Sequence, residues 1–204
     1  PLSTGSETTL FVIRDVGSRL LFAIPVRSKH PKALGIALTG IRKLLEDLRT
    51  ELGLPNREKI WTFHSDDGGE FRAAWFQTVI MELGGTWAAA PRGRHVPAAE
   101  TAIRIVLNGI RVSLETSGLP QRYWADAARH WVFLRNLEYA PYKNYLKARG
   151  SQVEPRWFGE LLFFKPDDNR VIRSKVGPSG APGAFLGFVG RRGVRVAYKD
   201  IYEH

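Results

Sequence analysis

The sequence predicts an α/β protein in which helices flank a mixed sheet, followed by a small strand-rich unit at the C-terminal end. Three observations predict this class. Two β-branched, apolar runs at 8–16 and 20–26 are separated by Gly17-Ser18, which is typical of a β-hairpin. Helical and strand-like patterns then alternate to about residue 137. Beyond that point, short apolar runs surround glycine-rich turns. Because the chain opens with a hairpin, the sheet is expected to be mixed rather than all-parallel.

The elements between the hairpin and the C-terminal unit follow from periodicity and from helix-breaking residues. Apolar residues recur at helical spacing from Pro31 to Leu52, and Gly53 ends that pattern. The remaining elements predicted for this part are a strand at 60–65, a helix at 71–83, a strand at 86–90, a long helix from Pro97 to Gly118 and a helix at 123–137.

The long helix after Pro97 carries one apolar and one polar face. The residues expected to face the core are Ala102, Ile103, Val106, Leu107 and Ile110. The polar face is predicted to hold Glu100, Arg104, Asn108 and Arg111, which lie close to one stripe of a helix. An exposed face with a Glu100–Arg104 pair, four residues apart, explains this stripe without any function.

The ends of the chain and one connection lack clear periodicity. Residues 1–7 are polar and are expected to be disordered or a remnant foreign to the fold. The predicted division is a core at 8–140, a linker at 141–157 and a small β-barrel-like unit at 158–204, with strands at 159–164, 184–189 and 194–198. The chain begins with Pro1, and Met81 is its only methionine, so we expect a piece of a longer polypeptide.

Composition narrows the possible partners. The net charge is +10, and residues 141–204 hold twelve basic against six acidic residues, so a polyanion such as nucleic acid is the favoured partner. The absence of cysteine excludes disulfides, a thiol nucleophile and a thiolate zinc site. No apolar run approaches the roughly 20 residues that cross a bilayer. No membrane partner is therefore expected.

Acidic side chains concentrate in the stretch His64-Ser65-Asp66-Asp67-Gly68-Gly69-Glu70-Phe71. Three carboxylates fall within five residues, directly after a predicted buried strand. Crowded carboxylates repel one another unless a cation or a proton lies among them. The stretch therefore predicts either a nearby metal ion or a protonated acid.

Two further acids lie at the ends of predicted elements. Asp15 ends the first strand, and Glu100 begins the long helix. If the fold brings both to Asp66, the three carboxylates form the oxygen-rich site that Mg²⁺ prefers, and two such ions can promote phosphoryl transfer. An aspartate in the position of Asp15 is also a common turn cap.

Several motifs together resemble the integrase core of a copia-type long-terminal-repeat retrotransposon, in the retroviral integrase superfamily. The most specific is HSDDGGEF at 64–71. The others are LFVIRDVGSR at 10–19, Arg27-Ser28-Lys29, Pro-Ala-Ala-Glu at 97–100, Gly118-Leu119-Pro120 and YWADA at 123–127. Trp157-Phe158-Gly159 and GAFLGF at 183–188 are similar to the small barrel that follows this core. The resemblance covers roughly residues 8–204.

The resemblance implies a ribonuclease-H-like fold, a pair of Mg²⁺ or Mn²⁺ ions, and Mg-dependent 3′-end processing and strand transfer of DNA. Asp15, Asp66 and Glu100 match the acid triad of the family and would be both catalytic residues and metal ligands. Asp67 stands where the family usually has asparagine, and Thr101 where it usually has arginine. Homo-oligomers and a nuclear location are further expectations from the family.

Candidate DNA contacts combine position with charge. His64 lies beside the acids, where a structural histidine is the competing interpretation. Phosphate contacts are predicted for Arg92 and Arg94 in the loop before the long helix, and for Arg104, Asn108 and Arg111 along it. Lys175, Arg191, Arg192 and Arg195 form a second basic group in the C-terminal unit, and a solvated basic rim explains this group equally well.

Two other functions compete with strand transfer. A decayed or host-adopted copy would bind DNA or self-assemble without catalysis, which the altered residues around Glu100 favour. A hydrolytic nuclease of the same fold class is the third possibility, and the C-terminal unit argues against it.

Overall fold

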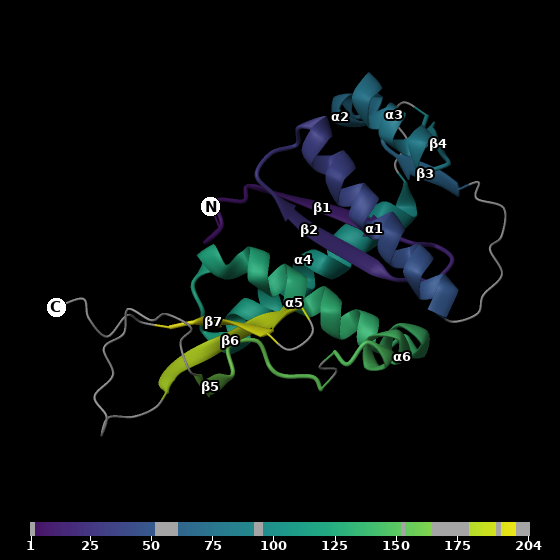
Figure 1. The fold of residues 1–204 in the computed structure, drawn as a ribbon. Coiled ribbons are helices and arrows are strands. Elements are labelled where there is room, and N and C mark those ends of the chain that lie inside the picture. Colours follow the sequence, from purple (N-terminus) through teal and green to yellow (C-terminus); the bar gives the residue numbers. More distant parts are fainter. Residues whose placement is uncertain are drawn as a thin grey trace.

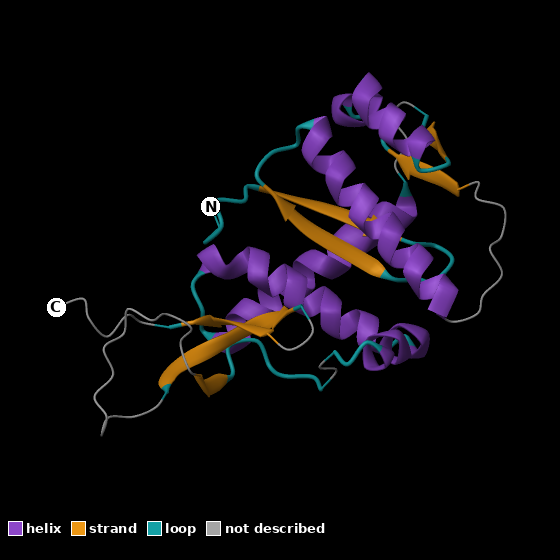
Figure 2. Ribbon diagram, in the orientation of Figure 1, coloured by secondary structure: helices purple, strands orange, loops and turns teal. Residues whose placement is uncertain are grey.

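The computed structural model of the chain describes residues 3–51, 61–91, 96–151, 154–164, 180–190 and 193–198. Its elements, in chain order, are β1 (Thr9–Arg14), β2 (Leu21–Val26), α1 (Pro31–Glu51), β3 (Trp61–Ser65), α2 (Gly69–Arg72), α3 (Ala74–Glu82), β4 (Gly85–Ala89), α4 (Pro97–Ser117), a 3₁₀ turn (Gln121–Tyr123), α5 (Trp124–Leu137), α6 (Ala140–Ala148), β5 (Leu161–Phe164), β6 (Ala181–Val189) and β7 (Gly193–Ala197). Helices and strands alternate along the first two thirds of the chain (Figures 1 and 2). The α/β class is therefore confirmed.

The β1–β2 hairpin lies between two layers of helices. On one face, Leu21 and Ala23 pack with Val106 of α4 and Ala128 of α5. On the other face, side chains of β1 and β2 pack against α1, α3 and α6 in two clusters that include Phe11, Phe22, Leu38, Ile41, Phe76 and Tyr142. Residues of opposite parity along each strand face opposite layers, because successive side chains of a strand point to opposite faces. This alternation builds the core.

The strands of the core do not join into one sheet. β1 pairs only with β2, in antiparallel fashion, and β3 pairs only with β4, in parallel fashion. The single mixed sheet predicted from the sequence is therefore wrong for the described residues. The two pairs nevertheless share one apolar cluster, which includes Phe11 of β1 and Phe63 of β3. Figure 1 shows β3 and β4 next to α3, and β1 and β2 next to α1.

Two helical predictions need correction. The stretch 141–157 was expected to be a linker, but Ala140–Ala148 forms α6. Tyr142 and Tyr145, three residues apart, bury their rings against α1, and Pro141 in the first turn is compatible with a helix start. The helix predicted at 71–83 is divided at Ala73, whose ψ of 128° is extended and interrupts the helical backbone. In α4, Ile103 and Leu107 are 43% and 40% exposed, so they flank the buried face rather than form it.

The C-terminal strands form an open antiparallel sheet in the order β5-β6-β7 within the described residues. The sheet packs on α5, and Phe158 and Leu186 join the apolar cluster that α4 and α5 form with β2. The expected small barrel at 158–204 is thus described only as this sheet, and the sheet shares its core with the preceding helices. None of the helices in the described ranges is long and apolar enough to cross a bilayer.

Residues 3–7, which were expected to be disordered, lie along α5. The Ser3 side chain is buried, and its hydroxyl accepts a hydrogen bond from the Glu7 N–H. The Thr4 N–H donates to the Arg122 carbonyl oxygen at 3.0 Å. Glu7 forms an ion pair with Arg129 of α5 at 2.7 Å. Polar side chains anchor this segment, so its polarity was not a sign of disorder.

Candidate functional site

The acidic stretch forms the turn between β3 and α2. Ser65, the last residue of β3, is buried, and its hydroxyl accepts a hydrogen bond from the Trp87 indole N–H at 2.9 Å. Asp66 follows it and is exposed. The Asp66 and Glu70 carboxylates approach Gly68 so closely that an added Cβ there would lie 3.3 Å and 2.9 Å from them. The turn therefore gathers the Asp66 and Glu70 carboxylates around Gly68.

Asp67 has a separate role in the same turn. Its carboxylate forms a two-point ion pair with the Arg72 guanidinium at the end of α2. The pair raises the pKa of Arg72, because the hydrogen bonds to Asp67 stabilise the charged guanidinium. Asp67 thus neutralises an arginine in the turn, in agreement with its place outside the predicted triad.

Asp15 acts as a turn cap. Its carboxylate accepts hydrogen bonds from the Ser18 N–H at 2.7 Å and from the Ser18 hydroxyl at 2.6 Å. The same turn is closed by a bond from the Asp15 N–H to the Leu20 carbonyl at 2.9 Å. A carboxylate that bonds to the backbone three residues on is the usual device of a tight turn.

Asp15 and Asp66 belong to different ends of the strand layer. The Arg42 guanidinium of α1 lies 4.7 Å from the ring centroid of Trp61, the first residue of β3, and Asp15 is among the charges that act on Arg42. Asp66 follows the last residue of β3, about 17 Å further along at the usual rise of a strand. The β1–β2 turn lies beside the C-terminal half of α1 (Figure 1).

The three predicted metal ligands do not form a metal site. Glu100 is exposed in the first turn of α4, Asp15 caps its hairpin, and Asp66 follows β3. Among the described residues, which include all three acids, no group of three or more His, Asp or Glu side chains could hold a metal ion. Two Mg²⁺ ions need several converging carboxylates. The acids in their present positions therefore do not fit that cofactor.

The other sequence-predicted contacts divide into exposed and undescribed residues. Arg104, Asn108 and Arg111 are exposed along α4, and an Arg111 Nη donates to the Asn108 Oδ1 at 3.0 Å. His64 is exposed on the outer side of β3. The predicted contacts that lie outside the described residues are Arg92, Arg94, Lys175, Arg191 and Arg192.

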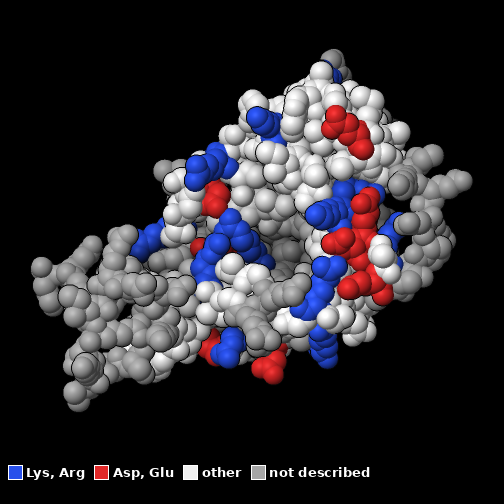
Figure 3. Space-filling view, in the orientation of Figure 1, with Lys and Arg blue, Asp and Glu red and all other residues white. Residues whose placement is uncertain are grey.

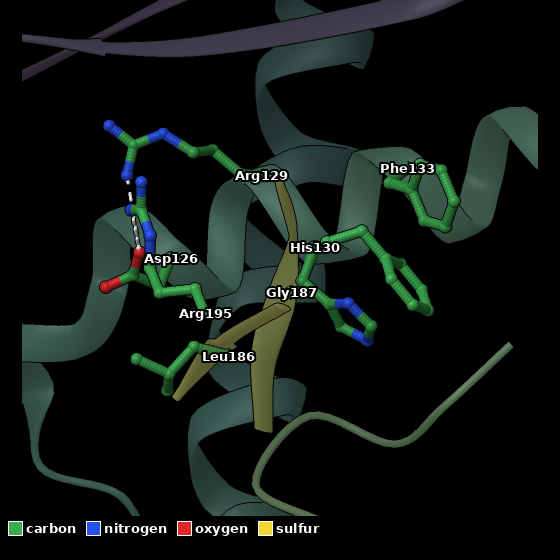
Figure 4. A pocket seen from close by; sticks show the side chains of 8 residues that line it. Asp126, Arg129, His130, Phe133, Leu186, Gly187 and Arg195 are labelled. Carbon is green, nitrogen blue, oxygen red and sulfur yellow. Dashed lines mark hydrogen bonds and ion pairs between the residues drawn. The ribbon is translucent and has the colours of Figure 1, made fainter. Parts of the chain in front are cut away.

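A pocket between α5 and the C-terminal sheet was not predicted from the sequence. Its volume is about 210 Å³, and Asp126, Arg129, His130, Phe133, Leu186, Gly187, Phe188 and Arg195 line it (Figure 4). The Asp126 carboxylate is almost fully buried and accepts hydrogen bonds from Arg195 at 2.5 Å and from Arg129 at 3.4 Å. Arg195, predicted as part of a DNA surface, is therefore committed to Asp126. The sequence offered one sign of this cluster, because Asp126 and Arg129 lie three residues apart on a predicted helix and can form an ion pair there.

Burial and hydrogen bonds shift the pKa values of Glu7 and His130, which lie at or beside this pocket. Burial alone would raise the pKa of Glu7, but hydrogen bonds from Ser3 and Arg129 outweigh it and lower the pKa to about 2. Burial lowers the pKa of His130, because an imidazolium ion would lose its hydration there. Burial therefore favours the neutral imidazole of His130, while Glu7 and Arg129 stay paired over the pH range of most experiments.

Charges of both signs alternate over part of the surface. Figure 3 shows mixed acidic and basic side chains on the right of the molecule, over α1 and α6. Ion pairs connect them, from Arg42 to Glu46 and from Arg149 to Asp47 and Glu51. The surface over α1 and α6 is therefore not uniformly basic, and its arginines are partly neutralised by acidic neighbours.

No family model matches the chain, and no curated protein matches it. Among solved structures, the chain is similar to the catalytic core domain of BIV integrase, at 16% sequence identity and a TM-score of 0.45. The likeness covers 69% of this chain and 86% of the BIV domain. A likeness of this size does not assign the chain to a family.

Proposed function

We propose that the chain is a DNA-binding domain of the copia-type integrase class that, by itself, does not catalyse strand transfer. The motifs at 64–71, 97–100 and 123–127 support the integrase class. The observation that carries the non-catalytic part is the position of Asp15, whose carboxylate bonds to Ser18 and lies away from Asp66. We also propose that the protein acts in the nucleus and forms a homo-oligomer.

The exposed polar side of α4 supports DNA as the partner. Arg104, Asn108 and Arg111 are exposed in succession along it. No ion pair between described residues involves either arginine. A row of this kind can contact successive phosphates without reading sequence. The net charge of +10 adds a general attraction for nucleic acid.

Replacing Arg104 and Arg111 together by alanine is expected to weaken binding to a 20-base-pair duplex about tenfold at 0.1 M salt. Each lost phosphate contact lowers the slope of log K against log salt by roughly 0.9, so the double variant should lose roughly 1.8. Fluorescence anisotropy of a labelled duplex, repeated at several salt concentrations, measures both quantities.

The matched control is Lys43→Ala with Arg49→Ala, which removes the same charge from exposed positions of α1. A change of equal size in the control would mean that net charge alone attracts DNA and that α4 is not the interface. Duplexes of unrelated sequence should give the same result, because phosphate contacts carry no sequence information.

Catalysis by a completed site is the second candidate. The Asp66 and Glu70 carboxylates converge on Gly68 at an exposed strand end, and Glu100 lies in the first turn of α4. This second function is Mg-dependent 3′-end processing and strand transfer. It requires that Asp15 leave Ser18 and join Asp66, or that another carboxylate supply the third metal ligand.

Disintegration of a branched DNA substrate separates the two candidates. The isolated chain is expected to show no Mg²⁺- or Mn²⁺-dependent strand joining. Joining that is lost in Asp66→Asn and also in Asp15→Asn would support catalysis by the predicted triad and contradict the proposal. The fold of each variant is checked by circular dichroism, since Asn at position 15 keeps an acceptor for the Ser18 N–H.

A further inference from the structure

The pocket between α5 and the C-terminal sheet has a buried floor and an exposed mouth. Leu186 and Gly187 of β6 are buried and form the floor. The Arg129 and Arg195 side chains are 38% and 47% exposed and lie at the mouth. A cavity of about 150 Å³ holds a benzene ring, and sites for drug-sized ligands begin at about 300 Å³. The pocket volume of about 210 Å³ therefore fits one small planar ring system.

Two phenylalanines give the pocket an aromatic wall. The Phe133 ring of α5 and the Phe188 ring of β6 have centroids 5.4 Å apart and an interplanar angle of 56°. Because the two rings contact each other, they form one continuous apolar surface rather than two faces of a slot. Both residues are partly exposed. A flat ring can stack against such a surface, as bases stack on aromatic side chains in complexes with single-stranded nucleic acid.

The charges around the pocket cancel. Asp126 and Glu7 carry two negative charges, and Arg129 and Arg195, to which they bond, carry two positive charges. An anion inside the pocket would lie beside the buried Asp126 carboxylate and be repelled by it, so the interior favours a neutral occupant. Each guanidinium has more N–H donors than these carboxylates use. The remaining donors, at the mouth, can contact a phosphate outside the pocket.

His130 adds a hydrogen-bonding group to the lining. It is 2% exposed, and neither ring nitrogen has a hydrogen-bond partner of ordinary geometry among the described residues. Burial lowers its pKa, and the nearby backbone of Arg156 opposes this shift without forming such a bond. Buried polar groups are normally paired, and a neutral imidazole has one donor and one acceptor to offer. In Figure 4, the imidazole and the Asp126–arginine cluster lie on opposite sides of Gly187.

We infer that the pocket binds an unpaired nucleobase of DNA and that Arg129 and Arg195 contact the phosphate linked to it. A base is neutral and flat, and its edge carries both donors and acceptors for the polar groups of Asp126 and His130. The aromatic side chain of a protein partner would fit the wall but would leave most of these polar groups unpaired. The inference rests on the proposed DNA-binding function and adds a base-binding site to the exposed side of α4.

Two labelled single strands of equal length test base binding by the whole chain. One is decathymidylate, and the other is an abasic strand with the same phosphates. Fluorescence anisotropy is expected to show about tenfold tighter binding of decathymidylate, because the strands differ only in bases that can stack on the wall. Equal affinities, or failure of both strands to bind while the 20-base-pair duplex binds, would overturn the inference alone. Failure of the strands and the duplex alike would overturn the proposed function as well.

Phe133→Ala removes part of the aromatic wall and is expected to abolish the preference for decathymidylate, while the affinity for the abasic strand stays within about twofold. The matched control is Phe163→Ala, which removes a ring that is 77% exposed on β5 and lies outside the pocket lining. This control should keep the preference. An equal loss in both variants, or a preference that survives Phe133→Ala, would overturn the inference.

Photocrosslinking to the wild-type chain makes the test independent of how well Phe133→Ala folds. The probe is decathymidylate with one thymine replaced by 5-iodouracil, which crosslinks to neighbouring aromatic side chains on irradiation. Mass spectrometry of the digested complex is expected to place the base on Phe133 or Phe188. A crosslink map that contains neither ring, for example one confined to the exposed Trp157 and Phe163, would overturn the inference.

Discussion

Replacing Asn136 by alanine is expected to lower the free energy of unfolding by about 3 kcal/mol, because the Leu21 N–H and C=O of β2 both lose the side-chain amide to which they bond. Asn136 is 5% exposed, so water cannot readily replace the amide. Urea denaturation followed by circular dichroism measures the change. The dependence of the unfolding free energy on urea should keep its slope, since the same surface unfolds.

Two variants isolate the hydrogen bonds of Asn136 from its volume. Asn136→Leu fills a similar space without a donor or acceptor and should be destabilised nearly as much as the alanine variant. Asn108→Ala removes an exposed asparagine from α4 and should change the unfolding free energy by less than about 0.5 kcal/mol. A loss below about 1 kcal/mol in Asn136→Ala would mean that Leu21 finds other partners.

Asp126→Asn is expected to cost about 2 kcal/mol of stability and to loosen β7. The Asp126 side chain is only 3% exposed and joins Arg195 of β7 to Arg129 of α5. Losing one partner of a buried pair costs about 3–5 kcal/mol, and exposed pairs contribute about 0–1. The two arginines are 47% and 38% exposed and can turn to water, so an intermediate value follows. Urea denaturation and hydrogen exchange of the β7 amides provide the measurements.

The matched control is Glu138→Gln, which makes the same change from acid to amide in an exposed pair with Arg135. It should leave stability within about 0.5 kcal/mol of the wild type. If Asp126→Asn and Glu138→Gln behaved alike, the buried carboxylate would not be what attaches the C-terminal sheet to α5.

The sequence by itself determined the local structure of most of the chain. Pro31 and Glu51 bound α1, within one residue of the helix expected from periodicity, and Pro97 and Gly118 bracket α4. Gly118 has a φ of 66°, the left-handed conformation that ends helices. Such signals are local, since each depends on residues within one or two turns. The α6 helix was missed because its two buried tyrosines are recognisable only beside α1.

Only the tertiary structure decided what the acids do. The turn of Asp66 was recognisable in the sequence, because three carboxylates after an apolar run are unusual. Whether Asp15 could meet Asp66 depended on which end of β1 lies near which end of β3. The relative direction of these two strands is set by long-range packing. The same long-range packing brought Asp126 to Arg195, 69 residues away. Local patterns contain no information about such contacts, because they form only when distant segments pack together.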